Sequence, residues 1–224
     1  YSNYNWFTRK FIDFFYYFRK FIKIIHSFYF GDYKGKHILI AVGRFHFYEG
    51  LSVEQVGLPI QLFKKLGATK VILTNSAGCL QSKWTLGDVM IVNGHYDFTY
   101  RDSSKNPELV NGPNYYCEHL IQKALKIKPD LRIGNYGWVL GPMYETKAEI
   151  DNMKKHGVNS VGMSTVPEIL MAHKLELDIL VLSLMSNYAI GLTNDDLNHQ
   201  IVLDNSVKYN KNFKLLLLSI LSEI

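Results

Sequence analysis

The sequence predicts an α/β fold in a single domain, with a mixed, twisted β-sheet flanked by helices on both faces. Short apolar runs alternate with stretches of helical periodicity from about residue 36 onward. The apolar runs are rich in Val, Ile and Leu, as expected of strands that are buried on both faces. The 224 residues suit one large domain, and no linker-like segment divides them.

Six segments are predicted to be strands, because each is a short apolar run bounded by glycine or polar residues. They are Lys36–Val42, Lys70–Thr74, Val89–Val92, Tyr136–Leu140, Ser160–Met163 and Asp178–Leu184.

Five segments are predicted to be helices, at residues 52–66, 114–128, 146–156, 166–174 and 195–221. Capping boxes mark two starts, Ser52 with Gln55 and Thr146 with Glu149. Pro167 falls in the first turn of another, where proline is tolerated. The polar residues 101–114 are expected to form a loop.

Residues 1–30 differ from the rest of the chain. They hold 14 of the 31 aromatic residues and five basic residues against one acidic residue. We interpret them as an atypical N-terminal segment that covers part of the core, ahead of a domain at residues 28–224. A membrane-surface helix is the less favoured interpretation.

Composition excludes several classes of protein. Without residues 1–30 the chain is nearly neutral, which disfavours nucleic-acid binding. No stretch is long and apolar enough to predict a membrane span. The two cysteines, Cys79 and Cys117, favour a reducing compartment such as the cytoplasm. No His or Cys spacing is typical of a metal site.

Polar or glycine-rich clusters follow five of the predicted strands. Ligands in open α/β sheets bind beyond the carboxyl ends of strands, so these clusters predict a composite small-molecule site. They are GRFHFYEG at 43–50, NSAG at 75–78, GPMYET at 141–146, MST at 163–165 and MSN at 185–187.

One group of side chains suits an oxyanion. Arg44 and His46 lie two residues apart on an expected extended segment and so point to the same side. Ser76 and Ser164, with backbone N–H groups near Gly78, add further donors. Alone, His46 reads as a structural histidine and Arg44 as half of a surface ion pair. Together the four side chains point to phosphate.

A second group suits a planar heterocycle. Glu145 and Asn187 offer acceptors and a donor for N–H and C=O edges. Tyr144 and Met163 supply flat, polarizable contact. Each taken alone is more typical of a core, turn or helix-entry residue. Their placement at strand ends favours a binding site.

Tyr48 and His199 complete the set as groups that reach sugar hydroxyls. Anion, ring and sugar contacts together predict a nucleoside and inorganic phosphate as ligands. No Ser-His-Asp arrangement is found, so a protein nucleophile is not expected.

The motifs GRFHFYEG, TNSAGCL, GPMYET, VGMSTVPE and SLMSN occur in this order and resemble those of the trimeric purine nucleoside phosphorylases. The resemblance runs from about Phe28 to the end of the chain. Related methylthioadenosine phosphorylases have Asp at the position of Asn187 and no His at that of His199. The sequence is therefore more similar to the branch that acts on 6-oxopurines.

The resemblance implies an enzyme of purine salvage, a pentosyltransferase that converts inosine or guanosine and phosphate to free base and ribose 1-phosphate. It implies that Asn187, His46 and Glu145 are the catalytic residues. The implied phosphate ligands are Arg44, His46, Ser164 and the backbone at Ser76, with Glu49 orienting His46. The implied purine contacts are Tyr144, Glu145 and Asn187, and the implied ribose contacts are Tyr48, Met163 and His199.

The resemblance also implies a cytoplasmic homotrimer that needs no metal or organic cofactor and takes phosphate as co-substrate. The family's Gly-Ser-Gly phosphate loop has no counterpart here, since the first glycine is Gly31. A catalytically impaired nucleoside-binding homologue is therefore an alternative. Methylthioadenosine phosphorylase and a membrane-associated scaffold are weaker alternatives.

Overall fold

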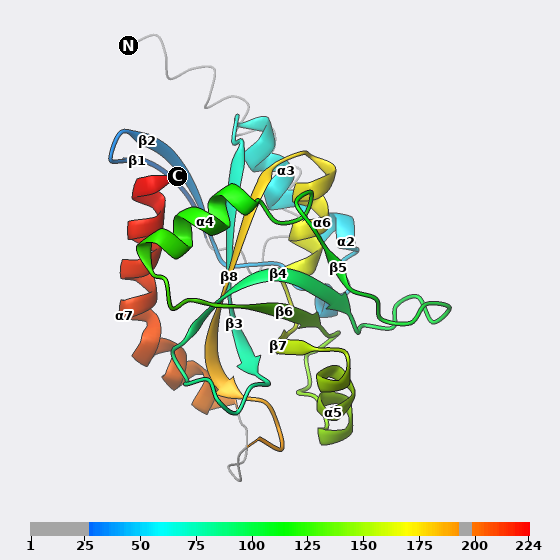
Figure 1. Cartoon of the computed structure of the whole chain (residues 1–224). Coiled ribbons are helices and arrows are strands. Elements are labelled where there is room, and N and C mark those ends of the chain that lie inside the picture. The colour runs from blue at the N-terminus through cyan, green and yellow to red at the C-terminus, as the bar shows by residue number, and fades with distance from the viewer. Residues whose placement is uncertain (1–26, 193–198) are drawn as a thin grey trace. The chain divides into compact units, whose positions relative to one another are not determined.

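The structure is a computed structural model that describes residues 27–192 and 199–224, in two units at residues 1–45 and 46–224 (Figure 1). The described part of the first unit contains a hairpin of β1 (Ser27–Tyr33) and β2 (Lys36–Val42). Lys34 and Gly35 connect them with positive φ at both positions, as a type I′ turn requires. The strand predicted at Lys36–Val42 is confirmed, and β1 lies partly in the aromatic segment.

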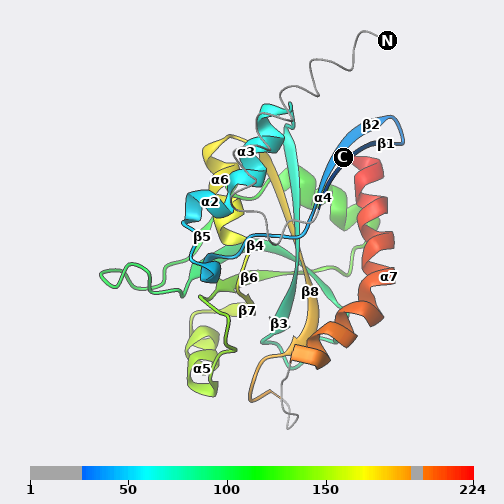
Figure 2. The ribbon, with the colours of Figure 1, turned by 180° about the vertical axis from the view of Figure 1, so that it is seen from behind.

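The second unit is built on a six-stranded sheet in the order β5-β4-β6-β7-β3-β8. β4 also pairs with β8, so five of the strands close into a ring (Figures 1 and 2). The strands are β3 (Lys70–Cys79), β4 (Val89–Asp97), β5 (Val110–Asn111), β6 (Arg132–Trp138), β7 (Val158–Gly162) and β8 (Asp178–Tyr188).

The sheet is mixed, as predicted. β3 runs parallel to β8, and β4, β6 and β7 run parallel to one another. The two groups meet in antiparallel contacts, β3 with β7 and β4 with β8. Three strands also continue past their predicted ends, because residues 75–79, 93–97 and 185–188 still pair with neighbouring strands.

Helices cover both sides of this sheet (Figures 1 and 2). α4 (Glu118–Ile127) and α7 (His199–Glu223) pack together on one side. α2 (Val53–Val56), α3 (Leu58–Lys65) and α6 (Val166–Lys174) pack together on the other, while α5 (Lys147–Lys155) lies against β7. The α/β fold with helices on both faces is thus confirmed.

The helix predicted at residues 52–66 is divided at Gly57. A Cβ built on Gly57 would lie only 2.7 Å from Met171 Cβ, so α6 approaches the backbone closely here. The capping box of Ser52 and Gln55 is present at the start of α2. The second predicted box, Thr146 with Glu149, opens α5. Both local signals are therefore confirmed.

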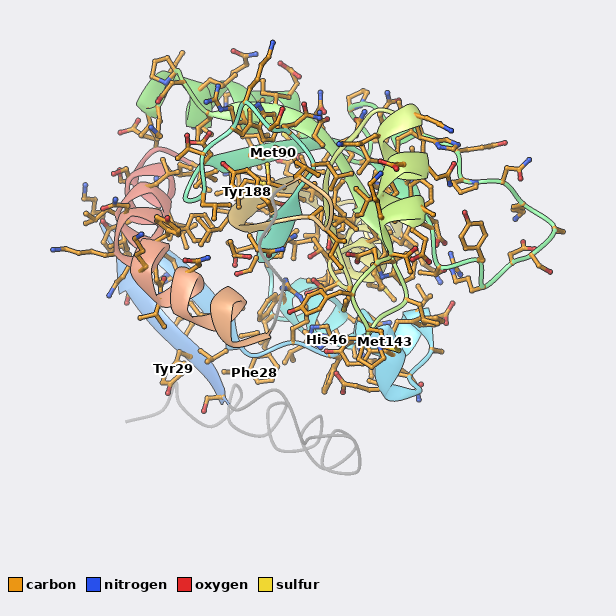
Figure 3. All side chains as sticks on the ribbon, turned by 90° about the horizontal axis from the view of Figure 1, so that it is seen from below. Phe28, Tyr29, His46, Met90, Met143 and Tyr188 are labelled. Carbon is orange, nitrogen blue, oxygen red and sulfur yellow. The ribbon has the colours of Figure 1, made fainter. Side chains whose placement is uncertain are left out.

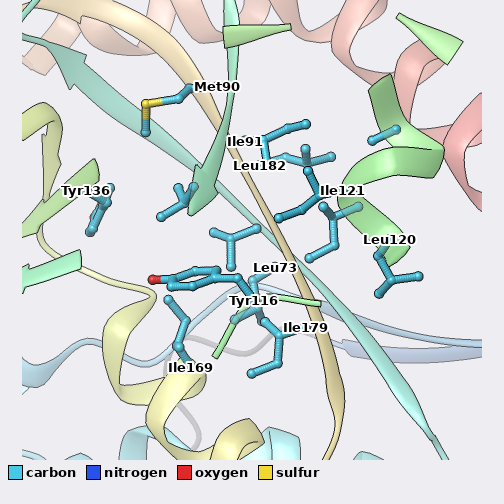
Figure 4. Close-up of a cluster of buried hydrophobic side chains, with 14 of the residues drawn as sticks. Leu73, Met90, Ile91, Tyr116, Leu120, Ile121, Tyr136, Ile169, Ile179 and Leu182 are labelled. Atoms are coloured by element: carbon cyan, nitrogen blue, oxygen red, sulfur yellow. The ribbon is translucent and has the colours of Figure 1, made fainter. Parts of the chain in front are cut away.

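The main hydrophobic core of the second unit fills the space between the sheet and its helices. Figure 4 shows part of it, with side chains from β3, β4 and β8 meeting others from α4 and α6. Leu182 and Leu120 are completely buried there, and Ile169 of α6 closes the cluster. Within the described residues, no helix combines the length and hydropathy needed to cross a membrane.

Candidate active site

Predicted site residues from three strands lie where the two groups of strands cross. The carboxyl end of β3 pairs antiparallel with β7, Gly78 opposite Val161. On its other edge Gly78 is in register with Asn187 of β8. Three of the predicted clusters therefore meet at one place, although their strands do not all run in the same direction.

A β-bulge sets the direction of Asn187. Ala77 is in register with Met185 and Gly78 with Asn187, so Ser186 is the extra residue on β8. The Ser186 hydroxyl donates to Asn187 Oδ1 at 3.0 Å, and Asn187 Nδ2 donates to the Tyr188 carbonyl at 3.1 Å. Asn187 is only 7% exposed, and its fixed amide keeps one N–H and one lone pair for a ligand.

Glu145 is the buried carboxyl group of the site, with 8% of its surface exposed. Burial raises its pKa; a backbone hydrogen bond partly opposes this rise, and the nearby charge of Glu149 adds to it. The following residue, Thr146, is the N-cap of α5, and its hydroxyl accepts from the Glu149 N–H at 3.3 Å. The capping box therefore fixes the segment that carries Glu145.

Two residues predicted to contact the sugar are packed over the loop that precedes Glu145. A Cβ built on Gly141 would lie 2.6 Å from Met163 Sδ and 2.8 Å from Tyr48 Cδ1. Gly141 also has φ of 70°, a conformation that favours glycine. Tyr48 and Met163 therefore lie against the same stretch of backbone. Burial raises the pKa of Tyr144 in this loop, and the charge of Glu145 adds to the effect.

Met143, between Gly141 and Tyr144, differs from its neighbours because its side chain points to the surface and is 82% exposed (Figure 3).

His46 and Glu49 form the pair that the sequence analysis expected. His46 Nδ1 lies 3.0 Å from Glu49 Oε1, and the His46 backbone N–H donates to the same oxygen at 2.8 Å. The His46 ring also stacks on Tyr48, with 4.8 Å between ring centroids. These contacts hold the His46 ring in one orientation.

Ser164 lies between β7 and α6, and its hydroxyl is 3.0 Å from that of Thr165. Thr165 in turn accepts a hydrogen bond from Asn75 Nδ2 at 2.9 Å. Asn75 and Thr165 belong to the clusters predicted from the sequence, but neither was assigned a role there. The available signal was their position inside the motifs TNSAGCL and VGMSTVPE, directly beside Ser76 and Ser164.

Of the other predicted site residues, Arg44 belongs to the first unit. Ser76 lies in β3 and is exposed. His199 is the first residue of α7, and its side chain lies outside the described residues. Within the ranges that the structure describes, no cluster of His, Cys, Asp or Glu could hold a metal ion.

Comparisons with known proteins identify the family of the chain. The chain matches the family model described as the phosphorylase superfamily over residues 13–222. It is 35% identical over 210 residues to purine nucleoside phosphorylase 1 of Bacillus subtilis, covering 86% of this chain and 75% of that relative. The corresponding enzyme of Geobacillus stearothermophilus is 33% identical over 195 residues, covering 82% and 71%.

Solved structures are similar as well. Schistosoma mansoni purine nucleoside phosphorylase in complex with adenosine has a TM-score of 0.79 at 27% identity, covering 88% of this chain and 77% of that one. Isoform 2 from the same organism, in complex with cytosine and ribose-1-phosphate, has a TM-score of 0.78 at 31% identity, covering 88% and 75%. The chain therefore belongs to the phosphorylase superfamily, in its purine nucleoside phosphorylase branch.

Proposed function

We propose that the protein catalyses the reversible phosphorolysis of 6-oxopurine ribonucleosides, inosine and guanosine, to the free base and ribose 1-phosphate. The main observation behind this proposal is that Glu145 and Asn187 are both buried, in a chain whose relatives are purine nucleoside phosphorylases. An ionised Glu145 accepts from the purine N1–H, and Asn187 faces the O6/N7 edge. Tyr144 packs on the ring.

In the proposed reaction a phosphate oxygen attacks C1′ of the ribose while the bond from C1′ to N9 breaks. The sugar becomes cationic in the transition state, and the phosphate dianion beside it stabilises that charge. The electrons of the broken bond move into the purine. Asn187 stabilises them by hydrogen bonding at the O6/N7 edge. The buried amide, held by Ser186, is suited to this role.

The phosphate contacts proposed are His46, Ser164, Arg44 and the backbone at Ser76. His46 is supported by its hydrogen bonds to Glu49 and Ser164 by its place at the start of the α6 segment. The ribose contacts proposed are Tyr48 and Met163, which pack together over Gly141, and His199. These groups position phosphate and sugar for attack at C1′, which is the main source of rate in such a mechanism.

Family resemblance supports further proposals about how the enzyme works. We infer a cytoplasmic homotrimer that uses phosphate as co-substrate and needs no metal or organic cofactor.

The deciding experiment is an assay of base release from inosine, guanosine and adenosine, with and without phosphate. Hypoxanthine release that requires phosphate is expected. Release without phosphate indicates a hydrolase, and binding of inosine without turnover indicates an impaired homologue. Asn187→Ala should lower kcat strongly, whereas the matched control Asn111→Ala, on the exposed edge strand β5, should not.

A further inference from the structure

The connection between β7 and α6 contains a strained turn. The Val166 N–H donates to the Ser164 carbonyl at 2.9 Å, which makes Thr165 the central residue of a γ-turn. Thr165 has φ of 76° and ψ of −43°, in the region of the rarer form of this turn. A β-branched residue with positive φ is an outlier, so something must hold Thr165 in place.

The hydrogen bond from Asn75 provides that constraint. Thr165 is fully buried, and its hydroxyl accepts from Asn75 Nδ2 at 2.9 Å, although the two residues are 90 positions apart. Asn75 is 8% exposed, and within the described part of the chain its Oδ1 has no hydrogen-bond partner. An unsatisfied buried oxygen is unfavourable. Of the two polar groups of this amide, only the N–H group makes a hydrogen bond here, so we take donation to Thr165 as the role of Asn75.

The 3.0 Å distance between the Thr165 and Ser164 hydroxyls is compatible with either group as the donor, and the bond from Asn75 favours Thr165. A hydroxyl group has one proton and two lone pairs. Because Thr165 Oγ1 already accepts from Asn75, its own proton is available for Ser164 Oγ, 3.0 Å away. The Ser164 proton is then directed away from Thr165. An anion has only acceptor atoms, so it needs a donor of this kind.

We propose that Asn75 and Thr165 are positioning residues that fix the Ser164 hydroxyl as a hydrogen-bond donor to phosphate. The chain runs from Asn75 Nδ2 to Thr165 Oγ1, from there to Ser164 Oγ, and from Ser164 to the anion. Neither Asn75 nor Thr165 contacts the phosphate itself. The inference rests on the proposed function, because it takes Ser164 as a phosphate ligand.

The test compares two variants of Thr165 in the full chain. Thr165→Val keeps the branched shape and removes the hydroxyl, whereas Thr165→Ser keeps the hydroxyl. Two quantities are measured: the Kd for inorganic phosphate by calorimetry, and the separate KM values for phosphate and inosine. Thr165→Val should raise the phosphate Kd and KM by about tenfold or more, as loss of a donor to a charged group predicts. The inosine KM should change less than about twofold, and Thr165→Ser should stay near wild type.

Asn75→Leu is the second variant, since it removes the donor without touching the γ-turn. It should weaken phosphate binding by a similar factor, and the double variant should be little worse than either single one, because both break one chain. Ser160→Ala is the matched control. Its hydroxyl is fully buried and, among the described residues, makes no hydrogen bond. Its loss should leave both KM values unchanged.

Equal effects on the phosphate and inosine KM values, or equal effects of Thr165→Val and Thr165→Ser, would overturn the inference. Either result would mean that the residues act only on the fold. A wild-type protein that binds phosphate but does not cleave inosine would contradict the proposed function alone, and the phosphate Kd values would still decide the inference. A wild-type protein that binds no phosphate would refute the inference directly.

Discussion

The side-chain amide of Asn187 occupies the space that a side chain at position 78 would need. A Cβ built on Gly78 would lie 3.3 Å from Asn187 Nδ2 and 3.1 Å from Val161 Cγ1. Gly78 therefore allows β3 to approach both β7 and β8 at the crossing point. The absence of a side chain at Gly78 is part of what positions the Asn187 amide, which we propose binds the purine.

Gly78→Ala should displace the Asn187 amide by a few tenths of an ångström. We expect kcat for inosine phosphorolysis to fall by roughly tenfold to a hundredfold, as for other small misplacements of a catalytic group. Overpacking should cost about 1–3 kcal/mol of stability. Steady-state kinetics and thermal unfolding measure both. Gly31→Ala is the matched control, because a Cβ there meets nothing within 4 Å. An unchanged kcat in Gly78→Ala would contradict the role of Asn187.

The raised pKa of Glu145 predicts how inosine binding depends on pH. Because burial raises this pKa, the carboxylate becomes protonated at a higher pH than an ordinary glutamate. A protonated Glu145 cannot accept from the purine N1–H. The KM for inosine should therefore rise as pH falls through this pKa. Glu145→Gln should have a high KM with no such pH dependence; a profile identical to wild type would exclude Glu145 from purine binding.

The raised pKa of Glu145 also predicts how the stability of the fold depends on pH. A carboxyl group with a raised folded-state pKa contributes stability that is fully present at low pH and is lost as pH rises through that pKa. A glutamine at position 145 cannot ionise, so the Glu145→Gln variant does not lose stability in this way as pH rises. Its Tm should therefore exceed that of the wild type at pH 7, and the difference should shrink toward pH 4. A constant difference between the two Tm values across this range would show that burial of the charge is not the cause.

Gly141→Ala should disturb the two residues proposed to contact the ribose. The new Cβ would overlap with Met163 Sδ and Tyr48 Cδ1, and alanine is strained at the φ of 70° found there. We expect the KM for inosine to rise by about tenfold and stability to fall by roughly 1–3 kcal/mol. Phosphate affinity, measured by calorimetry, should change much less. An equal loss of phosphate and inosine affinity would argue for general unfolding of the site.

Thr146→Ala removes the hydroxyl that caps α5. Loss of an N-cap side chain costs about 1 kcal/mol, and the hydroxyl accepts from the Glu149 N–H here. Thermal unfolding should show this loss, whereas Thr146→Ser should be close to wild type. The inosine KM should rise modestly because the cap fixes the segment that carries Glu145. A Tm equal to that of the wild type would show that the Thr146 hydroxyl does not contribute to stability.

Local signals predicted the elements of the fold well. The capping boxes at Ser52 and Thr146 depend on residues three apart, and both are present. Strand ends were predicted less well, because Asn75, Ser76 and Gly78 are poor strand formers in isolation. They are in β3 because β8 pairs with all three, and β7 pairs with Gly78 on the other edge. Pairing across the sheet thus overrides local preference.

In the site, too, local features were predicted from the sequence and contacts between distant segments were not. His46 and Glu49 are three residues apart, and their pairing follows from the motif. The bulge at Ser186 and the bond between Asn75 and Thr165 join distant segments, so no local pattern reveals them. The sequence predicted that the clusters meet beyond the carboxyl ends of strands but not how those ends are brought together. The clusters meet because β3 and β7 overlap antiparallel at their carboxyl ends.

Closure of the ring by β4 and β8 has a consequence for how the protein is made. Ala77 and Ser186, which are hydrogen-bonded to each other beside Asn187, are 109 positions apart in the chain. Contacts of such long sequence separation slow folding, because a large loop must close before they form. A nascent polypeptide that still lacks β8 also lacks Asn187 and the strand that pairs with β3 along its length. The contact of Asn187 with Gly78 is therefore expected to form only after most of the chain has been synthesised.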